Sequence, residues 1–336
     1  MIVAELSGNH QGSLGQALNL VRAAKAAGAD AVKLQTLNPD TITLKNGPNE
    51  HFRIKGGPWD GRHLYDLYKE TQIPREWHHQ LFMEGRRLGL KVFSTPFTPD
   101  DVDFLETLDC PIYKVASFEI TDLPLIKRIA RTGKPVIIST GMASLAEVMR
   151  VEQHFWDVTL LHCISEYPSP LEHANLGRLN DLKPICQDVG LSDHSMSPLP
   201  AVLAVGMGAK VIEKHLCLSR AAGGPDSGFS LEPSEFAEMV RMVRDAEKAM
   251  QPYEDPKPAN LRFRKAIWVV QDVLSGEEIT SDNVKVMRPA PEISLAPSFY
   301  DDILGARFNQ PLQRGTPLVF SHIEGAHNLS TSTAAG

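Results

Sequence analysis

The sequence has few cysteines and no cysteine pair at the spacing of a metal-binding motif. Its four cysteines, Cys110, Cys163, Cys186 and Cys217, are far apart, and most lie in or beside apolar runs. This pattern predicts buried, reduced thiols rather than a disulfide framework. No apolar run approaches the roughly 18 residues of a membrane helix. The N-terminus lacks the basic start and apolar core of a signal peptide. We therefore expect no membrane association and a cytoplasmic location.

The sequence also has no block of lysine and arginine residues. Its formal net charge is -7 over 336 residues. An acidic chain without a basic patch is not expected to bind nucleic acid. A small anionic substrate remains compatible with this balance, because the local charge of a site need not follow the net charge.

What the sequence does contain is a repeated unit of a short apolar run followed by an amphipathic stretch. The runs are rich in valine and isoleucine and bounded by glycine, proline or aspartate, as expected of strands buried on both faces. Eight alternations over about 250 residues predict a (β/α)8 barrel. A doubly wound open sheet is the alternative, but no GxGxxG motif follows the first run. The predicted strands are 1–6, 29–35, 90–95, 111–116, 135–140, 158–163, 188–193 and 210–215.

The predicted domain organisation follows from changes in composition. A catalytic barrel is expected over 1–250, with helices at 14–28, 122–133, 199–208 and 233–250. The long connection 36–75 is typical of a lid or binding loop. The proline-rich segment 251–260 predicts a linker. Residues 261–324 predict a small, mostly β module, and 325–336 a disordered tail.

Polar side chains follow almost every predicted strand. Barrel enzymes carry their chemistry at these strand ends, and buried Lys, Glu and His are costly there without a partner. Turn chemistry explains serine, threonine and aspartate at such positions, but not these three residue types. We therefore predict one shared site. The strand-end residues are Glu5, Lys33, Gln35, Ser94, Thr95, Lys114, Ser117, Glu119, Ser139, Thr140, His162, Ser192, Asp193, His194, Glu213, Lys214 and His215.

Two of these residues suggest a metal site. His194 and His215 end the seventh and eighth predicted strands, which are neighbours in a closed barrel. Two imidazoles there would share a divalent ion, with Glu5 of the first strand joining directly or through water. Nitrogen ligands with carboxylate or water favour Mn2+, Co2+ or Fe2+ over Mg2+. The alternative is a pair of core histidines.

Lys33 and Lys114 have two interpretations. Either lysine would form a Schiff base with a carbonyl, as in barrel aldolases, or hold an anion. The hydroxyl groups that surround Lys114 favour the anion, because phosphate needs many donors. The GGPDSGFSLEP segment, 223–233, carries Asp226 and is either a binding loop or a helix start.

These residues, in this order, resemble the sialic acid synthase (N-acylneuraminate synthase) family. The resemblance covers nearly the whole chain, and the module from Ala266 to Ile323 resembles that family's SAF, or antifreeze-like, domain. Within the family, GGPWDGRHLYDLYKE and GGPDSGFSLEP are most similar to the pseudaminic acid synthase branch. The matching motifs include AELSGNHQGSL, AGADAVKLQT, FSTPF, YKVASFE, GKPVIISTGM, VGLSDH and VIEKH.

The resemblance implies a cytoplasmic, metal-dependent condensation of phosphoenolpyruvate with an acylamino sugar. For the pseudaminic branch that sugar is 2,4-diacetamido-2,4,6-trideoxy-L-altrose. The metal, Mn2+, Mg2+ or Co2+, would lie on His194 and His215. Glu5 would act near the reacting carbon. The resemblance places phosphoenolpyruvate on Lys33, Lys114, Ser117, Ser139 and Ser192, and the sugar on Gln35, Glu119, Tyr167 and Asp226.

The resemblance also implies a homodimer in which Arg288 of the SAF domain reaches the partner's active site. The alternatives that stay open are a neuraminate or legionaminate synthase with the same chemistry, a Schiff-base aldolase, and a non-catalytic sugar-binding protein. The nearly complete set of polar strand ends argues against the last of these, since a barrel without catalytic demand need not keep them together.

Overall fold

The computed structural model describes residues 1–47, 50–253 and 258–326. The chain divides into two compact units between Gln251 and Pro252. Each unit is described by itself.

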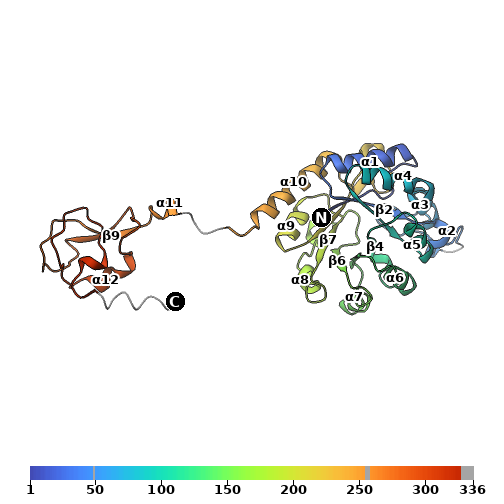
Figure 1. The fold of residues 1–336 in the computed structure, drawn as a ribbon. Coiled ribbons are helices and arrows are strands. Elements are labelled where there is room, and N and C mark those ends of the chain that lie inside the picture. The colour runs from blue at the N-terminus through green and yellow to red at the C-terminus, as the bar shows by residue number, and fades with distance from the viewer. Residues whose placement is uncertain (48–49, 254–257, 327–336) are drawn as a thin grey trace. The chain divides into compact units, whose positions relative to one another are not determined.

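The first unit is a closed barrel of eight parallel strands in sequence order, with helices around it (Figure 1). Each predicted strand matches one observed strand, so the (β/α)8 prediction is confirmed. Short apolar runs form these strands because both faces are buried, one against the barrel interior and one against the helices. The strands are β1 Ile2–Glu5, β2 Ala31–Thr36, β3 Lys91–Pro96, β4 Tyr113–Val115, β5 Val136–Ser139, β6 Val158–Cys163, β7 Val189–Asp193 and β8 Val211–His215.

The helices begin and end where the local sequence predicts. Ser13 caps α1 by accepting from the Gln16 amide, and Gly28 follows the helix with a φ of 88°. The predicted helices at 14–28, 122–133, 199–208 and 233–250 correspond to α1, α6, α9 and α10. The barrel helices are α1 Leu14–Ala26, α4 Arg75–Arg87, α5 Pro99–Glu106, α6 Leu123–Ala130, α7 Leu145–Glu152, α8 Arg178–Leu182, α9 Leu199–Gly206 and α10 Pro233–Ala249.

Short 310-helices lie in the loops at the carboxyl ends of the strands. Two of them carry residues of the site described below: η2, which follows β4, and η5, which lies in the loop after β8. The 310-helices of the barrel are η1 Glu50–Phe52, η2 Ser117–Glu119, η3 Leu171–His173, η4 Arg220–Ala222 and η5 Ser227–Phe229.

Gly190 allows β7 to pack closely between its neighbours. A β-carbon at this position would lie 2.3 Å from the Val211 carbonyl oxygen and 2.6 Å from Leu161 Cδ2. Both distances are shorter than real contacts, so only glycine fits here without a shift of β6 or β8. The close approach holds the ends of β7 and β8 in register, with Ser192 opposite Glu213 and Asp193 opposite Lys214.

The connection after β2 is more structured than the sequence suggested. Residues 36–75, expected as a lid or binding loop, contain helices α2 Pro39–Ile42 and α3 Leu64–Thr71 as well as η1. Helix α3 contacts the loop between β1 and α1, because the Thr71 carbonyl oxygen lies 3.2 Å from His10 Nε2. The segment therefore places a fixed helix beside the carboxyl end of the barrel.

The second unit contains an antiparallel strand pair and several isolated bridges around a small apolar core. Ile267, Val269 and Phe308 are fully buried in it. The mostly β module is thus confirmed. Its elements are α11 Pro258–Leu261, β9 Ala266–Val269, β10 Val284–Met287, η6 Pro297–Phe299, α12 Tyr300–Ile303 and η7 Phe320–His322.

Two predicted segments fall partly outside the described residues. Within the predicted linker, 254–257 lie outside them, and α11 occupies the last part of the segment. Within the predicted tail, 327–336 lie outside them. The boundaries 1–250, 251–260, 261–324 and 325–336 stay predictions.

The four cysteines are free and buried, as predicted. Among the described helices, none is long and apolar enough to cross a bilayer.

Candidate active site

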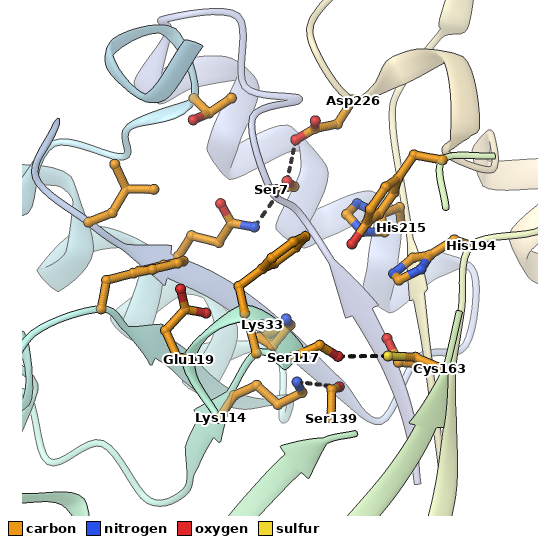
Figure 2. Close-up of a pocket in the computed structure, with 18 of the residues that line it drawn as sticks. Ser7, Lys33, Lys114, Ser117, Glu119, Ser139, Cys163, His194, His215 and Asp226 are labelled. Atoms are coloured by element: carbon orange, nitrogen blue, oxygen red, sulfur yellow. Dashed lines mark hydrogen bonds between the residues drawn. The ribbon is translucent and has the colours of Figure 1, made fainter. Parts of the chain in front are cut away.

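A cavity of about 320 Å³ opens at the carboxyl ends of the barrel strands (Figure 2). This volume suits a small-molecule ligand. Of the residues that the family resemblance assigns to the site, all but Glu5 and Arg288 line it. They are Lys33, Gln35, Lys114, Ser117, Glu119, Ser139, Tyr167, Ser192, His194, His215 and Asp226. The structure therefore brings together side chains from six strands and their loops, as the strand-end pattern predicted.

The floor of the cavity is a buried network of opposite charges. Lys114 Nζ donates to Ser139 Oγ at 2.7 Å and to the Val115 carbonyl oxygen at 2.9 Å. Lys33 Nζ lies 3.3 Å from Glu213 Oε1, which also accepts from Ser192 Oγ at 2.9 Å. Two cations and several hydroxyl donors thus face one small volume, which is the donor set that a phosphate or carboxylate requires.

The two lysines differ in their protonation. Burial lowers the pKa of Lys114 to about 8. Burial also disfavours the charged form of Lys33, but Glu213 and Glu5 outweigh it and raise the pKa of Lys33 to about 12. Lys33 is therefore a permanent cation and a poor nucleophile. Lys114 carries its charge at neutral pH and loses it in mildly alkaline solution.

Glu213, rather than Glu5, is the carboxylate that lines the cavity. Glu5 is fully buried, its Oε2 lies 2.7 Å from Lys33 Nζ, and its Oε1 accepts from the Ser7 amide. Burial raises the pKa of Glu5 to about 7. Burial opposes ionisation of Glu213 too, but Lys114 and Lys33 lower its pKa to about 2. Glu5 therefore contacts the cavity residue Lys33 but does not itself line the cavity.

The two histidines lie side by side on the wall, with ring centroids 5.5 Å apart. His194 Nδ1 lies 2.7 Å from the Ile164 carbonyl oxygen. A carbonyl only accepts, so Nδ1 carries the proton and Nε2 keeps its lone pair, as in histidines that bind metals. Burial lowers the pKa of His194, and that of His215 still further with the help of His194, so both rings are neutral.

The residues present fit a divalent ion. His215 Nδ1 is buried without a hydrogen-bond partner among the described residues, which is unusual unless a ligand completes it. Within the described part of the chain, no group of three or more His, Cys, Asp or Glu side chains is arranged to hold a metal. Glu5, which is paired with Lys33, is therefore not placed as a third direct ligand. The histidine pair leaves the remaining positions to water and substrate.

The other side of the cavity carries a chain of polar contacts. Gln35 Nε2 donates to Ser7 Oγ at 3.2 Å, and Ser7 Oγ donates to Asp226, which also accepts from the Gly8 amide (Figure 2). Asp226 is therefore part of the site and not only a helix start. Glu119 Oε2 has no partner among the described residues, and burial raises the pKa of Glu119 to about 7.

Tyr167 packs against His194, with ring centroids 4.3 Å apart. Burial raises the pKa of Tyr167, so its hydroxyl stays protonated and can donate to a substrate.

Several strand-end residues lie outside the cavity, which corrects the prediction of one shared site for all of them. Successive side chains of a strand point to opposite faces, so Lys214 points away while Glu213 and His215 face the cavity. Lys214 Nζ lies 2.5 Å from Asp193 Oδ2 and donates to the Ser195 and Ser197 carbonyl oxygens. Ser94, Thr95, Thr140 and His162 are also buried outside this cavity.

The ion pair with Lys214 gives Asp193 a structural role. Asp193 lies directly opposite Lys214 in the strand register and also accepts from the Ser195 amide. The buried pair ties the segment that carries His194 to the strand that carries His215. We infer that it fixes the spacing of the two histidines.

Arg288 belongs to the second unit. It follows β10, is exposed, and donates from Nε to the Phe263 carbonyl oxygen at 2.7 Å.

Sequence reasoning missed several residues that line the cavity. Ser7 and Cys163 are there, and Ser117 Oγ lies 2.9 Å from Cys163 Sγ. Trp59 and Phe229 form an aromatic wall with Tyr167. Cys163 ends β6, but the apolar run around it predicts a core residue rather than a site residue. Trp59 lies in a loop, where no periodicity indicates direction.

Comparison with protein families shows the family to which the chain belongs. A model described as the NeuB family matches residues 20–254, and a SAF domain model matches residues 264–324. The chain belongs to the NeuB family. These are the sialic acid synthases that the sequence motifs resemble, and the SAF match agrees with the predicted C-terminal module.

Individual relatives within the NeuB family are similar over nearly the full chain. Pseudaminic acid synthase of Helicobacter pylori is 42% identical, over 96% of this chain and 97% of its own. N,N'-diacetyllegionaminic acid synthase of Legionella pneumophila is 36% identical, over 96% of this chain and 94% of its own. The crystal structure of a putative spore coat polysaccharide biosynthesis protein E from Chromobacterium violaceum superposes with a TM-score of 0.78 at 28% identity. That alignment covers 96% of this chain and 99% of the other.

Proposed function

We propose that this NeuB-family chain is a pseudaminic acid synthase. It condenses phosphoenolpyruvate with 2,4-diacetamido-2,4,6-trideoxy-L-altrose to a nine-carbon 2-keto acid and inorganic phosphate. The observation that carries the proposal is a buried floor of two lysines beside a pair of neutral histidines. The identity of 42% to a pseudaminic acid synthase, against 36% to a legionaminic acid synthase, supports this branch of the family.

Phosphoenolpyruvate would bind on the floor. Its phosphate and carboxylate require neutralisation, and the buried side chains of Lys33 and Lys114 supply two charges. The hydroxyls of Ser139 and Ser117 would supply further donors, and Ser192 would do so by turning its proton from Glu213, to which it now donates, toward the ligand. Because Lys114 already donates to Ser139 at 2.7 Å, this lysine and this hydroxyl are oriented before the substrate arrives.

The sugar aldehyde would present C1 to this enol. His194 and His215 are the residues that would hold a divalent ion, Mn2+, Co2+ or Mg2+, which when bound polarises the aldehyde oxygen. The new bond joins C3 of phosphoenolpyruvate to C1 of the sugar. Water then adds to C2, and cleavage of the C–O bond of the resulting tetrahedral centre releases phosphate.

The buried carboxyl groups would serve two purposes, stabilisation of charge and transfer of protons. Glu213 is ionised and lines the cavity, so it stabilises the positive charge that develops at C2. Glu119, with a pKa near 7 and a free carboxyl oxygen, is suited to exchange a proton with the water or the sugar. Glu5 shares Lys33 with Glu213 and adjusts the charge of the floor as it titrates.

Gln35, Tyr167 and Asp226 would contact the sugar, because they line the cavity away from the lysines. Asp226 is held by Ser7 and the Gly8 amide, and so it is already oriented. A cytoplasmic site of action would follow from the substrate, since phosphoenolpyruvate is an intermediate of central metabolism.

We also propose a homodimer in which Arg288 completes the partner's site. Arg288 is exposed, and the barrel site contains two lysines but no arginine among its described lining residues. Mixing an inactive Lys114→Met chain with an inactive Arg288→Ala chain is expected to restore part of the activity. Activity of Arg288→Ala alone at the wild-type level would contradict the proposal.

The function is tested with a panel of sugars and phosphoenolpyruvate in the presence of Mn2+. Phosphate release is expected with the altrose derivative and much less with N-acetylmannosamine or the legionaminic acid precursor. Turnover of N-acetylmannosamine alone would contradict the assignment to the pseudaminic acid synthases. Borohydride with a keto acid separates the aldolase alternative, because a Schiff base would be trapped covalently and this enzyme would keep its activity.

A further inference from the structure

We propose that one face of helix α3 determines which sugar this enzyme accepts, by receiving the methyl group at C6 of the substrate. The inference rests on the proposed function and concerns the part of the cavity that lies away from the lysines. The face consists of Leu64, Leu67, Tyr68 and Thr71, all of which line the cavity.

The spacing of these residues explains why they share a face. Positions i, i+3, i+4 and i+7 lie above one another on an α-helix. Of the residues between them, Asp66, Lys69 and Glu70 are exposed, whereas Tyr65 is buried. Helix α3 is thus amphipathic, and at this end of the barrel the cavity lies against its apolar side.

The apolar surface continues beyond the helix. Leu37, Ile54 and Phe97 also line the cavity, and Leu37 is buried. Lysines and carboxylates form the floor, whereas this wall combines leucine, isoleucine and phenylalanine side chains with the hydroxyl groups of Tyr68 and Thr71. The cavity therefore has a charged part and a mostly apolar part.

Contacts on several sides hold the wall in position. Trp59 Nε1 donates to the Pro225 carbonyl oxygen at 2.7 Å, which ties the segment before α3 to the loop after β8. Tyr65, on the side of α3 that carries no cavity residue, donates to Asp40 at 3.0 Å. A wall fixed in this way discriminates by shape as well as by polarity.

The direction of the substrate follows from its chemistry. The phosphoenolpyruvate anion requires the lysines, and the new bond forms at C1 of the sugar. C6 is at the opposite end of the six-carbon chain, so it extends away from the floor. A methyl group there matches the side chains of Leu64 and Leu67, whereas a hydroxyl packed against these two leucines would lose its water without a hydrogen bond from them. Selectivity based on one such group amounts to about 10- to 100-fold in kcat/KM.

The test compares the 6-deoxy altrose derivative with its 6-hydroxy counterpart, each assayed by phosphate release. The wild-type enzyme is expected to prefer the 6-deoxy sugar at least about 10-fold. Leu64→Asn is expected to bring the two kcat/KM values within about threefold of each other, because the amide can pair with the hydroxyl. Its KM for phosphoenolpyruvate should not change, which separates the wall from the floor.

Leu44→Asn is the matched control, because Leu44 lies on the same segment but is 60% exposed and does not line the cavity. It should keep the wild-type preference. Leu67→Asn is a second variant, should Leu64→Asn not fold. The inference is overturned if the wild-type enzyme shows no preference, or if the folded variants keep it. If no altrose derivative is turned over but another acylamino sugar is, the proposed function fails. The role of the α3 face is then tested by comparing kcat/KM for that sugar and for its 6-deoxy form.

Discussion

Replacing Lys114 by methionine is expected to lower kcat/KM for phosphoenolpyruvate by about 10²- to 10³-fold, the usual cost of removing one charge-stabilising donor from a buried site. Methionine keeps most of the length and the apolar stem of lysine but removes the ammonium group that donates to Ser139. The anion would then lose its partner on the floor, while the histidine pair would be untouched. Initial rates of phosphate release at varied phosphoenolpyruvate concentration measure the effect.

The matched control is Lys127→Met, which removes an exposed lysine from helix α6. It should leave kcat/KM at the wild-type value. Thermal denaturation should show that Lys114→Met is folded. A folded Lys114→Met enzyme with full activity would exclude a role for Lys114 in anion binding.

The same lysine predicts a pH dependence. Burial lowers the pKa of Lys114 from its ordinary value to about 8, so the charge is present below pH 8 and is lost as the pH rises through it. The pKa of Lys33 is near 12, so Lys33 keeps its charge over this range. A plot of log(kcat/KM) for phosphoenolpyruvate against pH should therefore fall above about pH 8. The break should be absent from Lys114→Met.

Removing the divalent ion, or replacing His215 by alanine, is expected to lower kcat by about 10³-fold, which corresponds to roughly 4 kcal/mol of transition-state stabilisation. His215 Nδ1 has no partner among the described residues, and His194 is held by the Ile164 carbonyl so that its other nitrogen is free. EDTA should abolish phosphate release, and added Mn2+ should restore it to the wild-type enzyme but not to His215→Ala. Titration calorimetry with Mn2+ reports binding independently of turnover.

His162→Gln is the matched control for this experiment. His162 is also a buried histidine at a strand end, but it lies outside the cavity and bonds the Ala174 carbonyl oxygen. It should bind Mn2+ as the wild-type enzyme does. Undiminished activity of His215→Ala in the presence of Mn2+ would show that the pair is structural.

The strands and their order could be predicted because burial on both faces leaves a local signal. The run 135–140, for example, is short, apolar and followed by hydroxyl residues, and this pattern can be recognised without knowing which strands lie beside it. The topology then follows, because eight parallel strands, each followed by a helix, close into a barrel. The histidine pair could be predicted for the same reason, since His194 and His215 end consecutive strands and must be neighbours.

The orientation of individual strand-end side chains could not be predicted in full. Glu213, Lys214 and His215 are consecutive, but only the first and last face the cavity, and the register of β8 against β7 decides which. Glu5 ends β1 and is fully buried, but it pairs with Lys33 instead of lining the cavity. A shift of one residue in the register of β8 would have turned Lys214 toward the cavity and Glu213 and His215 away from it.

The sequence alone thus determined the barrel, the SAF module, the family, and the set of residue types that meet at one end of the barrel. Each of these depends on local patterns or on motifs that are contiguous in the chain. Only the tertiary structure decided that Glu213 lines the cavity, that Lys214 pairs with Asp193, and that a face of α3 forms an apolar wall. The physical reason is that charge pairing and burial depend on what lies opposite in space, and the partners come from other strands: Lys214 pairs with Asp193, 21 positions away, and Glu213 with Lys33 of β2.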